Sequence, residues 1–296
     1  MKKDYFKYFF ALLLFGSNGI VASLIDLSSY EIVLLRTMIG SIFLIAVFFI
    51  TKEKLTFYKH KKSFLFLAIS GIAMGASWLF LYEAYQRVGV SLASLLYYCG
   101  PVIVMILSPV LFKEKLTYTK IIGFVSVLIG ILLINKTALN SGGDAVGLYF
   151  AVMSAVCYSL MVIFNKKAKN ISGLQNSMLQ LFISFLTVAV FVGIKQGFKI
   201  EINSSDILPI FVLGLLNTGI GCYFYFSSIG NLPVQTVAIC GYLEPLSAVW
   251  FSLIFLKESM FPVQVAGAVL IIGGAVLGEL KHKQRKHKKP SAVLLI

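Results

Sequence analysis

Ten apolar stretches, each long enough to cross a bilayer, fill nearly the whole of this 296-residue chain. The second five repeat the first, because the segment Tyr98–Pro101 returns as Tyr242–Pro245 at an offset of 144 residues. Three glycine pairs keep the same offset: Gly75 and Gly219, Gly123 and Gly267, and Gly130 and Gly274. Because five spans is an odd number, the second repeat must cross the membrane in the opposite sense. Inverted repeats are typical of transporters with a site between the two halves.

The apolar stretches predict helices, since a lipid-exposed backbone must satisfy its own hydrogen bonds. The predicted spans are roughly 5–25, 30–50, 63–86, 91–112, 118–135, 145–164, 174–194, 207–228, 233–256 and 261–279. The expected fold is an all-α membrane protein with ten transmembrane helices in two inverted five-helix repeats. We assign residues 1–138 to the first repeat, 139–280 to the second, and 281–296 to a basic cytoplasmic tail.

The distribution of charge predicts the orientation. Only 13% of residues are charged, whereas a soluble domain carries about a quarter. The net charge of +14 lies in short clusters between spans, without the single aromatic-rich basic patch of a nucleic-acid-binding protein. With the N-terminus in the cytoplasm, 20 basic residues face the cytoplasm and 5 the other side. We therefore predict a plasma-membrane protein with both termini cytoplasmic, whose basic clusters contact acidic lipid headgroups.

The sequence offers no apparatus for catalysis within the membrane. A GxxxxGK[ST] phosphate loop is absent, and the three histidines lie in predicted loops or the tail. The four cysteines lie singly in apolar runs without a CxxC pair, which favours packing roles. We expect no enzyme activity, no metal and no cofactor. An ion gradient, such as that of protons, or the gradient of a substrate would then supply the energy for transport.

Three ionisable residues lie inside predicted spans, where a charge costs about 2.5–3.5 kcal/mol, so each is a candidate for function. Glu244 lies midway along span nine and is interpreted as a substrate ligand or a proton acceptor, against a purely structural hydrogen bond. Arg36 and Glu83 lie toward the outer face and either form an ion pair with each other or bind substrate. Arg36 is also suited to bidentate binding of a carboxylate.

Prolines and uncharged polar residues complete the predicted site. Pro101 and Pro245 hold equivalent mid-span places, and each is expected to free the carbonyl one turn earlier, at Tyr97 and Gly241. We interpret the two prolines as hinges rather than simple packing kinks. Aromatic residues in the spans either line a cavity or belong to interfacial belts. The remaining predicted substrate-binding residues are Asn18, Trp78, Tyr82, Tyr97, Tyr98, Asn217 and Tyr223.

Several segments resemble the EamA-type transporters of the drug/metabolite transporter superfamily. They are Phe15–Asn18 in span one, Ala93–Pro101 in span four, and the charged ends Phe112–Leu116 and Leu256–Glu258. Arg36 lies where that family often carries an arginine, whereas Phe15 replaces the more usual tryptophan. The resemblance covers residues 5–279 and implies a central cavity surrounded by spans one to four and six to nine. It also implies that spans five and ten are peripheral.

Members of that family move amino acids, aromatic compounds, nucleosides, sugars or sugar phosphates, and many are exporters. We therefore predict a secondary transporter that exports a small polar or amphipathic metabolite, with amino acids first, by alternating access. The alternatives are a passive facilitator of similar metabolites and a non-transporting membrane scaffold or sensor. The oligomeric state, monomer or homodimer, stays open, since the pair Gly274 and Gly278 suits internal packing or a dimer face.

Overall fold

The computed structural model describes residues 2–134, 144–255 and 262–279. All regular structure in these ranges is helical. Seven helical segments are long and apolar enough to cross a membrane, and two shorter apolar helices cover residues 118–133 and 265–278. An all-helical protein with many membrane-length helices is confirmed, and the count of ten spans remains a prediction. The segment Leu256–Glu258, the boundary at residue 138 and the basic tail lie outside the described residues.

The first half of the chain forms six α-helices and a short 3₁₀ turn. They are α1 (Lys2–Gly16), α2 (Asn18–Ala22), α3 (Ser29–Ile50), η1 (Phe57–Lys59), α4 (Lys61–Tyr97), α5 (Gly100–Phe112) and α6 (Tyr118–Ile134). The long helix α4 contains one candidate span and the beginning of the next. A capping box starts α3, since the Ser28 amide donates to the Glu31 carboxylate and the Glu31 amide to the Ser28 hydroxyl.

The second half repeats this order with one irregular helix. Its elements are α7 (Ala145–Lys167), α8 (Gly173–Lys195), α9 (Ile207–Phe211), η3 (Val212–Ile220), α10 (Gly221–Ile229), α11 (Val234–Cys240), α12 (Leu243–Phe255) and α13 (Pro262–Glu279). The nine-residue segment η3 is a π-helix and joins α9 to α10 within one candidate span. Such segments are rare and frequently lie at functional sites.

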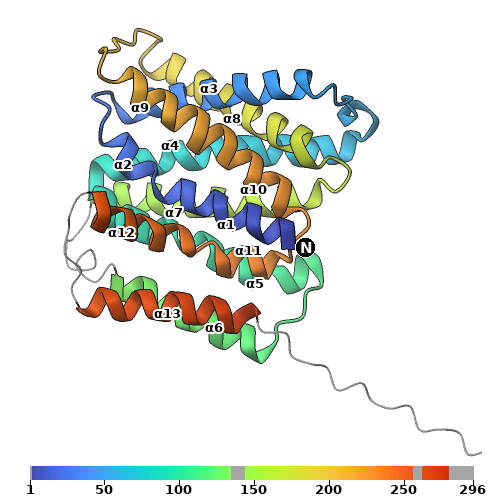
Figure 1. The fold of residues 1–296 in the computed structure, drawn as a ribbon, viewed down its shortest axis with the longest axis vertical. Coiled ribbons are helices and arrows are strands. Elements are labelled where there is room, and N and C mark those ends of the chain that lie inside the picture. The colour runs from blue at the N-terminus through green and yellow to red at the C-terminus, as the bar shows by residue number, and fades with distance from the viewer. Residues whose placement is uncertain (1, 135–143, 256–261, 280–296) are drawn as a thin grey trace, which may run out of the picture.

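The helices stack in layers, with α6 and α13 packed together as the outermost layer at one end of the long axis (Figure 1). At the other end α3 packs against α8. Between them, α4 packs along α7, and α1 packs against α10 and α12. The resemblance implied peripheral fifth and tenth spans, and α6 and α13 occupy that peripheral place.

Close helix contacts occur in pairs related by the 144-residue offset. A Cβ at Gly75 would lie 3.0 Å from the Cβ of Thr187, and one at Gly219 would lie 2.7 Å from a ring carbon of Phe43. Adding 144 to Gly75 gives Gly219, and subtracting 144 from Thr187 gives Phe43. The packing of α4 on α8 is therefore repeated by that of η3 on α3.

The outermost pair of helices carries the same relation. A Cβ at Gly274 would lie 2.5 Å from the carbonyl oxygen of Gly123, and one at Gly130 would lie 2.6 Å from that of Gly267. These contacts show that α6 and α13 are antiparallel and that their backbones are in direct contact. Gly278 packs on Ile239. The Gly274 and Gly278 face is therefore used inside the chain.

The predicted spans four and nine are both broken just before a proline. Helix α4 ends at Tyr97 and α5 begins at Gly100, whereas α11 ends at Cys240 and α12 begins at Leu243. The expectation that Pro245 frees the Gly241 carbonyl is wrong, because that oxygen accepts the Glu244 amide at 3.1 Å. The proline lies in the first turn of the new helix α12, where its missing N–H costs little.

Candidate functional site

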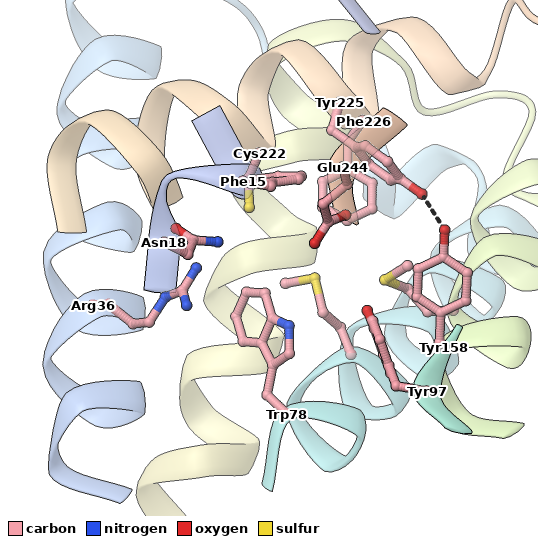
Figure 2. A pocket seen from close by; sticks show the side chains of 12 residues that line it. Phe15, Asn18, Arg36, Trp78, Tyr97, Tyr158, Cys222, Tyr225, Phe226 and Glu244 are labelled. Carbon is pink, nitrogen blue, oxygen red and sulfur yellow. Dashed lines mark hydrogen bonds between the residues drawn. The ribbon is translucent and has the colours of Figure 1, made fainter. Parts of the chain in front are cut away.

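A small cavity, called the central cavity below, lies where helices from both halves of the chain converge (Figure 2). Its lining residues are Phe15, Asn18, Arg36, Met74, Trp78, Tyr97, Tyr158, Met161, Cys222, Tyr225, Phe226 and Glu244. Six come from each half. The volume of the cavity is about 50 Å³, which is room for a few water molecules. The lining combines one cation, one carboxylate and an aromatic wall.

Arg36 is held in place by two contacts with different chemistry. Its Nε donates to Thr218 Oγ1 at 2.9 Å, and its guanidinium carbon lies 4.8 Å from the centre of the Trp78 ring. The Thr218 hydroxyl in turn donates to the carbonyl of Leu213, five residues earlier in η3. A stacked guanidinium keeps a fixed orientation. Because Nε is already used, the two terminal amino groups remain available to a ligand.

Asn217, the neighbour of Thr218 in η3, holds the break between α1 and α2. Its Nδ2 lies 3.0 Å from the Leu14 carbonyl, 2.9 Å from Ser17 Oγ and 3.0 Å from Asn18 Oδ1. Asn217 is 2% exposed and stands behind Asn18 rather than in the cavity. The contact occupies the Asn18 oxygen, so the Asn18 side-chain nitrogen points into the pocket (Figure 2).

Glu244 enters the cavity from the first turn of α12, after the helix break at residues 241 and 242. Its backbone is fixed on both sides, since its amide donates to Gly241 and its carbonyl accepts from Ser247 Oγ at 2.8 Å. The carboxylate points into the middle of the pocket, away from the helix (Figure 2). A negative group at a helix N-terminus is favoured by the helix dipole.

Aromatic side chains build the remaining walls. The rings of Tyr97 and Tyr158 meet edge to face at 5.3 Å, and Phe15 lies 5.8 Å from Tyr225. The hydroxyls of Tyr158 and Tyr225 lie 3.4 Å apart, within hydrogen-bond distance (Figure 2). Behind Tyr225, the fully buried Tyr8 donates its hydroxyl to the Val237 carbonyl at 2.7 Å. Tyr8 therefore lies between the cavity-lining Tyr225 and α11.

A polar cluster fastens the start of α11. The Glu114 carboxylate accepts the amides of Val234 at 2.7 Å and Gln235 at 3.1 Å. The Gln235 side chain is fully buried; it donates to Ser108 Oγ at 3.0 Å and accepts from Lys120 Nζ at 2.8 Å. The charged sequence after span four therefore serves as a cap for a helix of the other half.

The structure brings together five of the ten predicted substrate-binding residues: Asn18, Arg36, Trp78, Tyr97 and Glu244. The other five lie elsewhere. Asn217 supports Asn18, as described above. Tyr82 packs on Tyr85 at 5.3 Å, Tyr98 receives the Tyr242 hydroxyl on its carbonyl at 2.6 Å, and Tyr223 lies 5.3 Å from Lys7 Nζ.

The pairing of Arg36 with Glu83 considered from the sequence is wrong. The Glu83 carboxylate lies 2.9 Å from Lys195 Nζ and 3.2 Å from Arg87 Nε, at the end of the bundle that carries Ser28. It lines a different cavity, on another face of α4. Arg36 is instead held by Thr218 and Trp78, so it is not neutralised by a neighbouring carboxylate of its own half.

Seven lining residues were absent from the predicted site: Phe15, Met74, Tyr158, Met161, Cys222, Tyr225 and Phe226. Most are ordinary apolar residues of membrane helices, which their sequence alone does not distinguish from packing. For one of them, the repeat offset could have predicted a place in the cavity. Cys222 lies 144 residues after Trp78, so a cavity on the pseudosymmetry axis receives both.

Comparison with known proteins identifies the class. The model of the EamA-like transporter family matches this chain twice, over residues 4–136 and 145–278. The chain therefore belongs to the EamA-like transporter family and is an integral membrane protein. The two matches follow one another along the chain and are nearly equal in length, in agreement with the repeat found in the sequence.

Curated relatives cover most of the chain. An uncharacterized transporter, YxxF, of Bacillus subtilis is 25% identical over 281 residues, which is 92% of this chain and 88% of the relative. A probable amino-acid metabolite efflux pump of Salmonella typhimurium is 24% identical over 212 residues, 68% of this chain and 71% of the relative. One chain of known crystal structure aligns with a TM-score of 0.81 at 18% identity, over 95% of this chain and 97% of that one, and shares the fold.

Proposed function

We propose that this protein is a secondary transporter that exports amino acids or similar small zwitterions by alternating access. The observation that carries the proposal is that Arg36 of the first repeat and Glu244 of the second both line one aromatic-walled cavity. The transporter lies in the plasma membrane with ten spans and both termini in the cytoplasm. The 20 to 5 distribution of basic residues supports this orientation.

The chemistry of the cavity suits a ligand that carries both charges. The two terminal amino groups of Arg36 match the two oxygens of a carboxylate. Glu244, together with the side-chain oxygens of the tyrosines, accepts hydrogen bonds from an ammonium group. A zwitterion neutralises both protein charges at once, whereas a singly charged ligand leaves one of them buried and unpaired, which is costly. The aromatic wall accommodates an apolar side chain.

The symmetry of the contacts supports an inverted repeat and hence alternating access. A two-fold axis that exchanges two antiparallel helices packed side by side must run perpendicular to them. For α6 and α13, this supports an axis that lies in the membrane plane. Inverted repeats allow one half to rock against the other around a fixed site. In this proposal, Tyr8 and α11 seal the cavity from the cytoplasm.

Two further observations favour amino-acid export. The efflux pump of Salmonella typhimurium is named for amino-acid metabolites and is similar over two thirds of this chain. Glu244 is a carboxylate in the transport path, which suits exchange of a proton against the substrate ammonium. Proton-driven antiport would supply the energy for export.

The test begins with purified protein and a metabolite library. Amino acids that bind the folded state raise the melting temperature by mass action. The best ligand is then followed in proteoliposomes with imposed proton gradients. We expect the direction of its flux to depend on the imposed proton gradient, and the ligand to accumulate on one side of the membrane above its equilibrium concentration. Flux that only equilibrates would identify a facilitator, and no flux of any ligand would identify a scaffold or sensor; either result overturns the proposal.

The orientation has its own test. Single cysteines introduced at Lys59 and Lys167 should react only with reagents that reach the cytoplasm, whereas one at Ser28 should react from outside intact cells. External labelling at Lys59 or Lys167 would overturn the orientation without affecting the proposed substrate.

A further inference from the structure

A second cavity opens between α4, α7 and α8 on the side of the bundle away from the central cavity. It is lined by Tyr30, Ala76, Leu79, Phe80, Glu83, Phe150, Thr187, Phe191 and Lys195, and is called the α4–α8 groove. Its volume is about 340 Å³, whereas that of the central cavity is about 50 Å³. The transport cycle proposed above uses none of these residues.

The groove faces the membrane rather than the protein interior. On α4, Phe80 follows Trp78 by two residues, a rotation of about 200° around the helix, so the two side chains leave opposite faces. Beside the groove on α8, Phe191 is 38% exposed and Ile194 is 83% exposed. Exposed apolar side chains on a membrane-spanning helix contact lipid, so an occupant can enter from the bilayer.

One end of the groove is ionic and balanced in charge. Glu83 lies 2.9 Å from Lys195 Nζ and 3.2 Å from Arg87 Nε, and Arg87 NH1 lies 3.4 Å from Asp144. Lys195 also donates to the Tyr30 hydroxyl at 2.7 Å. The cluster therefore holds two cations and two carboxylates, with side chains of Arg87, Asp144 and Lys195 between 41% and 46% exposed. Such a cluster complements a headgroup that carries both charges.

Below the ions the groove is apolar. Phe80 and Phe150 stack at 5.8 Å, and Leu79 and Phe191 form the other walls. The small side chain of Ala76 leaves the lower end open. From Glu83 to Ala76 the helix rises about 10 Å, a large part of the roughly 15 Å that one leaflet contributes to the hydrocarbon core. An acyl chain fits this length and this lining.

We infer that the α4–α8 groove binds a zwitterionic phospholipid of the outer leaflet, for which phosphatidylethanolamine is the probe. Its phosphate pairs with Lys195 and Arg87, its ammonium with Glu83 and Asp144, and an acyl chain lies along Phe80. The assignment to the outer leaflet rests on the proposed orientation. The bound lipid joins α4 to α8, and thereby the outer ends of the two repeats.

The experiment uses the full-length protein, stripped of lipid in detergent, and titrates phosphatidylethanolamine. Binding is read by native mass spectrometry and by the melting temperature. Ala76→Trp fills the groove, and Ile72→Trp is its matched control, since Ile72 is a 51% exposed residue of the same helix outside the groove. We expect at least tenfold weaker binding for Ala76→Trp and wild-type binding for Ile72→Trp.

Lys195→Gln provides a second variant that leaves the apolar part unfilled, and it should also bind at least tenfold more weakly. Equal binding by wild-type and Ala76→Trp protein would overturn the site. If anionic phosphatidylglycerol stabilises the protein as strongly as phosphatidylethanolamine does, the assignment of a zwitterionic headgroup is wrong. Displacement of the lipid by a transported amino acid would make the groove part of the substrate path instead. Transport by Ala76→Trp is measured in parallel, so a failed lipid site and a failed transporter give different results.

Discussion

Around the central cavity, the first repeat carries Arg36 where the second, 144 residues later, carries Gln180. Arg36 lines the cavity, whereas Gln180 is fully buried and accepts a hydrogen bond from Asn165 at 3.2 Å. At a second pair of equivalent positions the roles reverse. Glu244 of the second repeat faces the cavity, whereas its counterpart in the first is Gly100.

The Tyr158 ring takes the place that a side chain at Gly100 would occupy, since a Cβ there would lie 2.6 Å from it. The repeats are thus alike in the glycine contacts that form the scaffold and unlike in the side chains that face the cavity. The symmetry accounts for the repeated fold and suits the proposed rocking motion, and the proposed substrate-binding residues lie where the symmetry is broken. Substitutions that remove the differences should therefore affect transport, and those at equivalent scaffold positions should affect stability equally.

The largest expected effect is that of Glu244→Gln, which removes the one carboxylate lining the cavity in the described structure. The amide keeps shape and hydrogen bonding but neither exchanges a proton nor balances an ammonium. Flux in proteoliposomes should fall at least about tenfold, equivalent to about 1.4 kcal/mol, with a nearly unchanged melting temperature. Glu53→Gln, in an exposed loop, is the control. Wild-type flux and pH dependence in Glu244→Gln would remove this carboxylate from the mechanism.

Arg36→Gln gives the first repeat the residue of the second. It should raise the KM for a zwitterionic substrate about fivefold, since one charge-assisted hydrogen bond contributes roughly 1 kcal/mol more than a neutral one. A decarboxylated analogue of the same substrate, which lacks the group bound by Arg36, serves as the control. If the KM values of both compounds rise equally, Arg36 has a structural role only.

Thr218→Val tests whether the π-helix positions Arg36. The change removes the hydroxyl that accepts from Arg36 Nε and keeps the shape of the side chain. We expect KM to rise about two- to threefold, as for loss of a bond of roughly 0.5 kcal/mol, while Thr218→Ser retains wild-type KM. A loss of stability that the serine variant fails to rescue would instead indicate a packing role for the methyl group.

The smallest effect on transport is expected at the scaffold, where the repeats agree. Gly130→Ala and its equivalent Gly274→Ala both push a Cβ against backbone, at 2.6 and 2.5 Å from a carbonyl oxygen. Overpacking of this kind costs about 1–3 kcal/mol, so both variants should melt several degrees lower, by similar amounts, with KM changed less than twofold. Unequal shifts would argue against the two-fold relation of α6 and α13.

The sequence predicted the helical membrane fold and the repeat because hydropathy and a constant offset are properties of the chain itself. It also singled out Arg36, Trp78 and Glu244, which line the central cavity, because charged and polar aromatic side chains are costly inside a span. Their binding of substrate stays a prediction. Glu83 belonged to the same class and was misplaced. Its partner Lys195 lies 112 residues away on α8, and the sequence around Glu83 does not predict such a contact.

Two other errors have causes that only the structure reveals. Asn217 and Thr218 are adjacent in η3, and the first contacts Asn18 whereas the second contacts Arg36. Both partners lie about 180 to 200 residues away along the chain, so the sequence around Asn217 does not predict them. Likewise, the break before Pro245 is a restart of the helix, so the Gly241 carbonyl keeps a partner. The proline indicated where the helix breaks and gave no information on how the break is closed.

The central claim, that substrate binds in the cavity shared by the two repeats, has a native reporter. Cys222 lines the cavity, whereas Cys157 does not. Two variants, each keeping one of these cysteines and alanine at the other three positions, are treated with a small uncharged methanethiosulfonate reagent. A transported amino acid should slow labelling of Cys222 at concentrations near its KM and leave Cys157 unaffected. An unchanged Cys222 rate at saturating substrate, in protein that still transports, would contradict the account.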